Sequence, residues 1–205
     1  MYTLYGSLGS GSAAVEMALH ACQLPFTVVR ASTCEPDSAL EELARVNPLR
    51  QIPTLVLPDG SVMTESAAIL IHLGLVAPEG RLLPVSPSAR AQAIRGLVFI
   101  AANCYSAIGI NDYPERWTAG SHDKLRQGAR RQLHRHWEVF ADTFPATPWL
   151  SGDAPGALDF LAAVVSKWAG TRAHLEAHRP ALLATLQRLE AHAGVAAIVR
   201  AHWPG

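Results

Sequence analysis

The pattern of apolar and polar residues changes about 80 residues into the chain. Before that point, short β-prone runs alternate with helically spaced apolar positions, and turn-forming residues separate them. The runs that predict strands are 2–5, 26–29, 53–57 and 61–63, and those that predict helices are 13–22, 40–46 and 66–75. Three helix starts carry residues suited to side-chain capping, namely Ser12, either Asp37 or Ser38, and Thr64. The order βαβαββα predicts an α/β layer.

The remainder of the chain is predicted to be helical. Residues 79–88 are rich in proline and turn formers and predict a linker. Beyond the linker, helical spacing covers 89–110, 122–144, 158–169, 180–192 and 195–202. The predicted fold class is therefore α/β plus all-α, with an N-terminal domain at 1–78 and an all-helical C-terminal domain at 89–205.

Charge and composition exclude several classes of function. Lysine plus arginine equals aspartate plus glutamate, at 17 each, so the formal net charge is zero. Residues 1–78 carry −4 and residues 79–205 carry +4. Overall neutrality argues against non-specific nucleic-acid binding. The sequence contains no uninterrupted run of about 18 apolar residues, so we expect no transmembrane helix. The three cysteines are far apart and show no metal or disulfide spacing, so we expect a cytoplasmic protein without a metal site.

The segment from Asn47 to Leu70 combines features that suit a peptide-like ligand. Pro53 opens a predicted strand, and a cis bond between Ile52 and Pro53 would turn the Ile52 backbone N–H and C=O outward to pair with an extended peptide. Glu65 and Ser66 begin a helix, whose free N–H groups attract a carboxylate. The Glu65 carboxylate can accept hydrogen bonds from an α-ammonium group. The alternative is a helix cap beside an edge proline, with no ligand.

The loop at residues 6–12 has the sequence GSLGSGS and lies between the first predicted strand and helix. A glycine- and serine-rich loop that leads into a helix offers N–H donors and hydroxyls to an anion. A thiolate bound there would be stabilised, and its pKa lowered, by the helix dipole. The alternative is a flexible loop whose serines cap the helix.

The sequence NPLRQIPTLVLPDGSVMTESAAILIHL resembles the glutathione-binding half of the cytosolic glutathione transferases. The flanking segments also fit that family, so the resemblance spans essentially the whole chain. It implies a thioredoxin-like N-terminal domain, a homodimer, and glutathione as co-substrate without a metal. It also implies the residues that hold glutathione: the backbone of Ile52 before a cis Pro53 for the cysteinyl unit, Glu65 and Ser66 for the γ-glutamyl group, and Gln51 and Arg50 near the glycyl carboxylate or γ-glutamyl group.

The same resemblance places a thiol-activating residue in the loop at 6–12. Counting from Leu4 assigns this role to Ser10, as in the theta-, zeta- and nu-like serine classes. Aligning backwards from Leu24 shifts the register and leaves Ser12 as an alternative. A third alternative is stabilisation by backbone N–H groups alone.

The helical domain carries residues that suit an electrophilic co-substrate. The residues that would form such a pocket are Leu8 of the loop and, from the helical domain, the aromatic or basic side chains Tyr105, Tyr113, Arg116 and Trp117. Core packing plus a surface loop is the alternative. Asp159 has a structural role at a helix start, where Gly156 replaces the hydroxyl residue that is usual in this family, which predicts a weaker cap.

These observations favour conjugation of the glutathione thiolate to small, partly apolar electrophiles. A glutathione-dependent disulfide reductase or peroxidase, or a binding module without catalysis, would use the same glutathione site.

Overall fold

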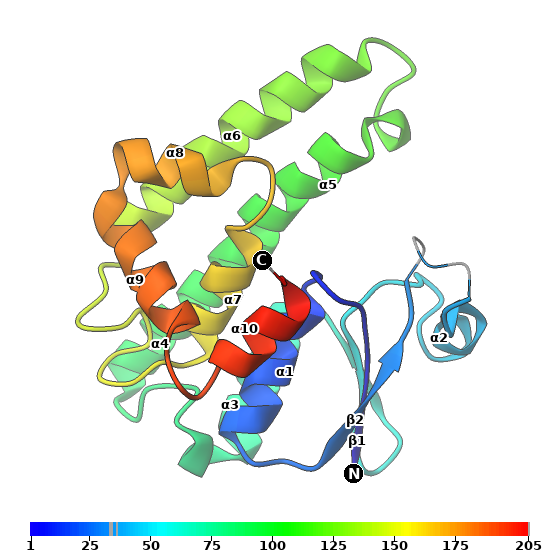
Figure 1. Cartoon of the computed structure of the whole chain (residues 1–205), viewed down its shortest axis with the longest axis vertical. Helices are drawn as coiled ribbons and strands as arrows, with labels where there is room; N and C mark the ends of the chain where they lie inside the picture. The colour runs from blue at the N-terminus through cyan, green and yellow to red at the C-terminus, as the bar shows by residue number, and fades with distance from the viewer. Residues whose placement is uncertain (33–34, 36, 205) are drawn as a thin grey trace.

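The computed structural model describes residues 1–32, 35 and 37–204. An N-terminal sheet domain lies beside a larger set of helices (Figure 1). The sheet has the order β2-β1-β3-β4, in which β1 and β2 are parallel and the other neighbours are antiparallel. Its strands are β1 (Tyr2–Gly6), β2 (Phe26–Arg30), β3 (Thr54–Val56) and β4 (Val62–Thr64). The helices of this domain are α1 (Ser12–Ala21), α2 (Leu40–Val46) and α3 (Ser66–Val76).

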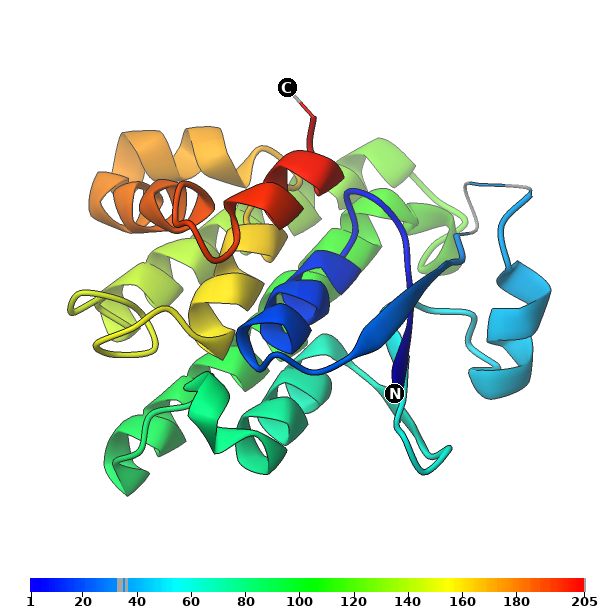
Figure 2. The ribbon, with the colours of Figure 1, turned by 60° about the horizontal axis from the view of Figure 1, so that its bottom comes forward.

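Helices cover both faces of the sheet (Figure 2). Successive residues of a strand point to opposite faces, and β1 follows this rule. Leu4 packs into the main core with residues of α1 and α3. Tyr5 packs on the other side with Leu43 of α2. This arrangement confirms the predicted thioredoxin-like N-terminal domain.

The rest of the chain is helical, as predicted. Its α-helices are α4 (Pro87–Phe99), α5 (Ser106–Asp112), α6 (His122–Thr143), α7 (Ala157–Val165), α8 (Thr171–His178), α9 (Pro180–Glu190) and α10 (Ala196–His202). Short elements are the 3₁₀ turns η1 (Pro78–Gly80) and η3 (Pro114–Arg116) and the π-helical turn η2 (Ile100–Tyr105). Because η2 joins α4 to α5 without a break, the three form one continuous helix.

One predicted helix end was wrong, and one helix was not predicted. The helix expected to reach residue 169 ends at Val165, and Ala169 has a positive φ of 54°. The following helix, α8, was not predicted. Within it only Thr171 and Leu175 are buried, so it lacks a repeating apolar face.

The predicted side-chain caps were also wrong. Gly11 and Glu65 are the N-caps of α1 and α3, and neither helix start has a side-chain cap. Helix α2 begins after Ala39 without a side-chain cap. The Ser38 hydroxyl instead bonds the backbone of Ser32, at 2.9 and 3.0 Å.

Helix α7 is buried along its whole length and joins the two domains. It contacts α1 and α3 on one side and α4 and α9 on the other. At its start, Asp159 accepts hydrogen bonds from the backbone N–H groups of Leu150, Ser151 and Gly156, at 2.8, 2.9 and 3.1 Å. Burial raises the pKa of the Asp159 carboxyl, and these donors oppose the rise. Asp159 thereby fixes the 150–156 loop to the helix.

The hydroxyl missing at Gly156 is supplied from elsewhere. Ser151 Oγ accepts the Leu158 N–H at 3.2 Å, and the Leu82 carbonyl accepts the Ala157 N–H at 2.9 Å. A Cβ at Gly156 would lie 2.6 Å from the Leu82 oxygen and 2.8 Å from Ser151 Cβ. The glycine therefore makes room for groups that satisfy the start of α7.

The continuous helix at residues 87–112 is long and apolar enough, by length and composition, to cross a membrane. Core helices of soluble proteins meet the same criteria. Here Leu97, Ile100 and Cys104 lie in the core, and Gly96 packs so closely on α7 that a Cβ would lie 2.7 Å from Leu158.

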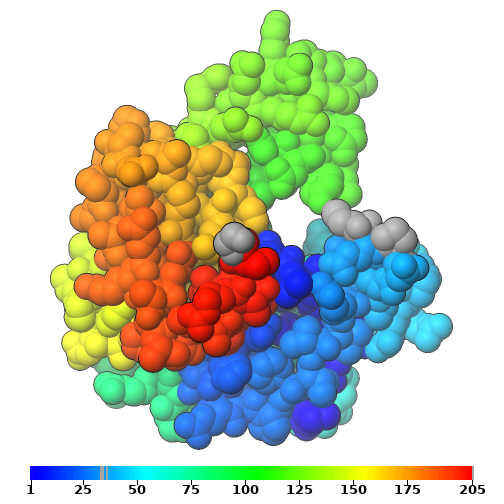
Figure 3. Space-filling view, in the orientation of Figure 1, coloured from blue at the N-terminus to red at the C-terminus, as the bar shows by residue number. Residues whose placement is uncertain are grey.

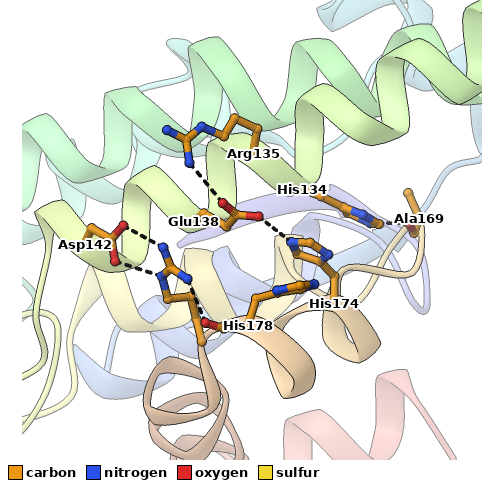
Figure 4. Close-up of polar contacts among 8 residues, drawn as sticks. His134, Arg135, Glu138, Asp142, Ala169, His174 and His178 are labelled. Atoms are coloured by element: carbon orange, nitrogen blue, oxygen red, sulfur yellow. Dashed lines mark hydrogen bonds and ion pairs between the residues drawn. The ribbon is translucent and has the colours of Figure 1, made fainter.

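Helices α6 and α8 meet through stacked histidines (Figure 4). The rings of His134 and His174 are 4.3 Å apart and nearly parallel, and His178 stacks on His174 at 4.3 Å. His174 Nε2 lies 2.9 Å from the Glu138 carboxylate, and His134 Nε2 lies 3.1 Å from the Ala169 carbonyl oxygen. The loop after α7 is thereby attached to α6.

Candidate functional site

The loop between β1 and α1 is held by a compact set of serine hydrogen bonds. The Ser7 carbonyl lies 2.8 Å from Ser10 Oγ and 3.2 Å from Ser12 Oγ, and the two hydroxyls are 2.8 Å apart. The Ser12 N–H also donates to Ser10 Oγ, at 3.2 Å, and the Ser7 N–H donates to Ser12 Oγ, at 3.3 Å. The two serines are therefore coupled through one shared acceptor.

The two candidate serines differ in accessibility. Ser12 is 1% exposed and packs so closely under Gly6 that a Cβ there would lie 2.5 Å from Ser12 Oγ. Ser10 is partly exposed at the loop surface. Ser12 is thus placed to hold the loop, and Ser10 is placed to meet a ligand.

The Ile52–Pro53 peptide bond is cis. Asn47 organises this segment from beneath: it is buried, and its amide donates to the Gln51 carbonyl at 3.1 Å and to Thr54 Oγ1 at 2.9 Å. Asn47 belongs to the sequence motif, but its hydrogen bonds to Gln51 and Thr54 could not be predicted from the sequence.

Gln51 is exposed and Ile52 half-buried at the start of the segment. The exposed Arg50 has a φ of 52°, and its guanidinium lies 3.5 Å from the Glu41 carboxylate. These residues remain candidates for contact with the ligand's backbone and its glycyl end.

Glu65 and Ser66 occupy the start of α3, a helix of 11 residues. Glu65 is the N-cap, with a φ of 64°, and its side chain is exposed, while Ser66 is 7% exposed. The geometry combines free N–H groups at the helix start with a carboxylate beside them. This pair suits a group that carries both a carboxylate and an ammonium.

Tyr105 connects the helical domain to these elements. Its hydroxyl is buried, lies in direct contact with Gly11, and has no hydrogen-bond partner within the described residues. Burial raises the pKa of Tyr105 to about 12, with Ser66 lowering it and Glu65 raising it as smaller influences. A neutral phenol thus faces the serine loop and the start of α3.

The remaining predicted pocket residues do not gather at this point. Leu8 is 52% exposed on the loop. Tyr113, Arg116 and Trp117 lie beyond α5 at the tip of the helical hairpin, where the Arg116 guanidinium sits 4.2 Å from the centre of the Tyr113 ring. Figure 1 shows this tip projecting away from the N-terminal domain.

Two tryptophans and a lysine approach the loop instead. The Trp168 ring lies 5.9 Å from the Tyr105 ring, and Trp203 Nε1 would be 3.6 Å from a Cβ at Gly9. Lys167 Nζ is 4.7 Å from the centre of the Trp203 ring. Trp168 and Lys167 could not be assigned from the sequence because they follow an unpredicted helix end.

A buried hydrogen bond positions the C-terminal helix. His202 Nε2 lies 2.9 Å from the Glu16 carboxylate, with the His202 side chain 3% exposed. This contact fixes α10 on α1 and brings Trp203 to the loop. A cavity of about 340 Å³ lies behind the loop, lined by residues that include Ser7, Leu8 and His202.

Other groups that could activate a thiol are engaged or inert. The Tyr5 hydroxyl donates to Glu42 at 2.6 Å, on the α2 side of the sheet. Burial raises the pKa of the Cys22 thiol to about 11 and that of Cys104 to about 12. The third cysteine, Cys34, lies outside the described residues. Among the residues that the structure describes, no group of three or more ligand side chains is arranged to hold a metal ion.

The chain is similar to glutathione S-transferases in its N-terminal domain and over most of its length. The model of the glutathione S-transferase N-terminal domain matches residues 12–75. The uncharacterised GST-like protein YncG of Escherichia coli K12 is 30% identical over 169 residues, which is 82% of each chain.

Solved structures extend the similarity to the whole fold. A glutathione transferase homologue from Sulfitobacter with bound glutathione is 24% identical, with a TM-score of 0.84 over 97% of this chain and 96% of that one. A glutathione S-transferase from Methylobacterium radiotolerans, in complex with glutathione sulfonate, is 27% identical, with a TM-score of 0.77 over 97% and 94%. The chain therefore belongs to the cytosolic glutathione S-transferase family, as its sequence motifs predicted.

Proposed function

We propose that the protein is a glutathione transferase that joins the glutathione sulfur to small, partly apolar electrophiles. The observation that carries this proposal is the convergence of three elements: the serine loop, the start of α3 and the Tyr105 hydroxyl. Tyr105 touches Gly11 and is close enough to Ser66 and Glu65 to share their electrostatic environment. The relative from Methylobacterium radiotolerans binds glutathione sulfonate, which supports a glutathione ligand here.

Glutathione would bind across the loop, the Pro53 segment and α3. The exposed Glu65 carboxylate would accept the α-ammonium of the γ-glutamyl group, and the N–H groups at the start of α3 would donate to its carboxylate. The Ile52 backbone would pair with the cysteinyl unit. The unpartnered Tyr105 hydroxyl can donate to a ligand oxygen or sulfur, since its pKa of about 12 keeps it protonated at neutral pH.

Ser10 is the residue that we assign to the thiolate. The Ser7 carbonyl can accept from either serine hydroxyl. When Ser12 donates to Ser7, the Ser10 proton is free to point at a bound sulfur, while the Ser12 N–H still donates to Ser10 Oγ. This exchange lets Ser10 donate to the thiolate without leaving the Ser7 carbonyl unpaired.

The reaction then proceeds by nucleophilic substitution or addition. The glutathione thiol loses its proton to solvent, and the thiolate forms a C–S bond with the electrophilic carbon. In a substitution, the leaving group departs with the electron pair of its bond. In an addition to a conjugated double bond, the π electrons move to the neighbouring carbon, which then takes a proton from solvent. The loop N–H groups and the Ser10 hydroxyl hold the thiolate in place until it reacts.

Activity with a neutral electrophile tests this function. We expect the protein to conjugate glutathione to 1-chloro-2,4-dinitrobenzene with release of chloride. Ser10→Ala should lower kcat by about 100-fold, the usual effect of removing one donor from a developing or bound anion, with little change in glutathione affinity by calorimetry. Ser106→Ala is the matched control, since Ser106 bonds only its own helix, at the Ala102 carbonyl. A wild-type protein that neither binds glutathione nor conjugates this compound would refute the proposal.

We further propose a homodimer. Exposed apolar side chains lie on α3 and on two elements that contact it, β4 and α4, namely Val62, Leu75, Val76 and Val98. Burial of such residues drives association. Light scattering after gel filtration should show a dimer for the wild type and a monomer for Leu75→Asp/Val98→Asp.

A further inference from the structure

A closed chain of contacts surrounds the surface above Ser10. On one side Gly11 touches the Tyr105 hydroxyl, and the Tyr105 ring faces Trp168. On the other side Gly9 lies against the Trp203 indole. All three aromatic side chains are partly exposed. The space-filling view shows a hollow between the loop, the end of α10 and the α5 hairpin (Figure 3). Tyr105, Trp168 and Trp203 therefore form an aromatic wall beside the loop.

Lys167 completes that wall with a cation. It directly precedes Trp168, and its ammonium lies 4.7 Å from the centre of the Trp203 ring. The Trp203 indole thus extends from the loop backbone at Gly9 to the Lys167 ammonium. The Lys167 side chain is 18% exposed, so its charge is largely removed from water yet still reachable.

The charge of Lys167 is only partly balanced within the protein. Its ammonium lies 2.7 Å from Glu190 Oε1, and the Arg172 guanidinium lies 2.7 Å from the same oxygen. Two cations therefore share one carboxylate, which leaves a net positive charge behind the aromatic wall. The Glu16 carboxylate on α1 lies 2.9 Å from His202 Nε2. A partly desolvated excess cation attracts an anion strongly.

We propose that Lys167 binds an anionic group on the electrophile, so that the preferred second substrates are aromatic or conjugated electrophiles carrying a carboxylate or sulfonate. The apolar part of such a molecule stacks on Trp168 and Trp203, and its anionic group takes the free charge at Lys167. This inference rests on the proposed function, which places the attacking thiolate at Ser10. The alternative role for Lys167 is to hold the end of α7 to α9, which would affect charged and neutral ligands equally.

Binding of a matched pair of unreactive compounds tests the proposal without turnover. The probes are 3,5-dinitrobenzoate and its neutral amide, titrated by calorimetry with the glutathione site filled by S-methylglutathione. Lys167→Met keeps side-chain length and removes the charge, and Lys167→Arg restores it. The chain has one other lysine, Lys124, on the exposed first turn of α6. Lys124→Met is therefore a control with the same change in net charge.

We expect Lys167→Met to weaken dinitrobenzoate binding by about tenfold or more, the loss typical of one charge-assisted hydrogen bond. The amide should change by less than about twofold, and Lys167→Arg and Lys124→Met should retain the preference for the carboxylate. Equal affinity of the wild type for the two probes, or an equal loss of both in Lys167→Met, would overturn the proposal.

Turnover separates this inference from the proposed function. The reactive pair is 4-chloro-3,5-dinitrobenzoate and 4-chloro-3,5-dinitrobenzamide. The thiolate forms a C–S bond at the chlorine-bearing carbon, and chloride leaves with the bond electrons. The proposed function predicts turnover of the amide by wild type, and Lys167→Met should lower kcat/KM for the carboxylate alone. If the wild type does not turn over the amide, the proposed transferase function is contradicted. If Lys167→Met loses the preference for the carboxylate but keeps full activity with the amide, the role of Lys167 is supported.

Discussion

The Tyr105 hydroxyl lies in direct contact with Gly11, the residue before α1. The contact joins the helical domain to the serine loop at the point where we place the glutathione sulfur. Gly11 has a φ of −60°, which any residue can adopt, so the glycine is required by space and not by backbone conformation. A side chain at this position would displace the phenol.

This relationship predicts a defect that a second substitution repairs. Gly11→Ala places a methyl group against the Tyr105 hydroxyl and should lower the free energy of unfolding by about 1–3 kcal/mol, the usual cost of overpacking. In Gly11→Ala/Tyr105→Phe the hydroxyl is gone, and the nearest ring carbon would lie 3.6 Å from the new Cβ. Stability measured by urea denaturation should then recover. A double variant no more stable than Gly11→Ala would contradict the contact.

The start of α7 predicts that a substitution toward the family pattern is harmful. Gly156→Ser would restore the usual hydroxyl, but its Cβ would lie 2.6 Å from the Leu82 carbonyl oxygen and 2.8 Å from Ser151 Cβ. We expect a loss of about 1–3 kcal/mol in the free energy of unfolding. Ser151→Ala should also destabilise, by about 1–2 kcal/mol, because the Leu158 N–H loses its acceptor.

The double variant Gly156→Ser/Ser151→Ala separates the effect of crowding on stability from the effect of the lost hydrogen bond. Removing the Ser151 hydroxyl should relieve part of the crowding, so the double variant should be more stable than the sum of the single losses predicts. Strict additivity in chemical denaturation would argue against this account of the cap.

Local patterns in the sequence predicted the elements that depend on local chemistry. The strands predicted at 53–57 and 61–63 and the helix predicted from Ser66 follow from adjacent residues, and the structure contains all three as β3, β4 and α3. The glutathione-binding candidates were accessible to sequence reasoning for the same reason.

Contacts between distant residues could not be predicted in this way. Tyr105, in η2, meets Gly11, and Trp203, just after α10, meets Gly9, because the helical domain packs against the N-terminal domain. Apolar spacing indicates which face of a helix is buried but not what it is buried against. Local patterns also concealed Ser151, whose hydroxyl accepts the N–H of Leu158, seven residues further along the chain. Tyr113 and Trp117 were grouped with Tyr105 because of their proximity in sequence, although the hairpin carries them to its tip.

The different burial of the two loop serines predicts separate defects. Ser12→Ala removes a buried hydroxyl that both accepts from and donates to the Ser7 backbone, so stability should fall by about 1–3 kcal/mol. Ser10→Ala removes a partly exposed hydroxyl and should change stability by less than about 1 kcal/mol while lowering kcat. Thermal unfolding of both variants beside their kinetics checks this division. If Ser12→Ala kept wild-type stability and lost the most activity, the two roles would be reversed.

The burial of His134 predicts a dependence of stability on pH. Burial is the main reason that the pKa of His134 is lowered, with His174 and Arg130 contributing and Ala169 and Glu138 opposing. The folded chain therefore resists protonation at this site, and the unfolded chain binds more protons as pH falls. Stability is retained above the unfolded histidine pKa of about 6.5 and declines below it.

His134→Gln removes this titration while its amide can still donate to the Ala169 carbonyl. The free energy of unfolding, from urea denaturation at pH 5, 6 and 7, should depend less steeply on pH in this variant than in the wild type. His174, His178, Glu138, Arg130 and Arg135 are present in both proteins, so their contributions largely cancel in the comparison. His136→Gln, on the same helix but in contact with the Asn103 carbonyl, controls for the loss of a histidine from α6. Identical pH slopes for wild type and His134→Gln would show that the buried ring does not resist protonation, because only a difference in proton uptake between folded and unfolded chains can change the slope.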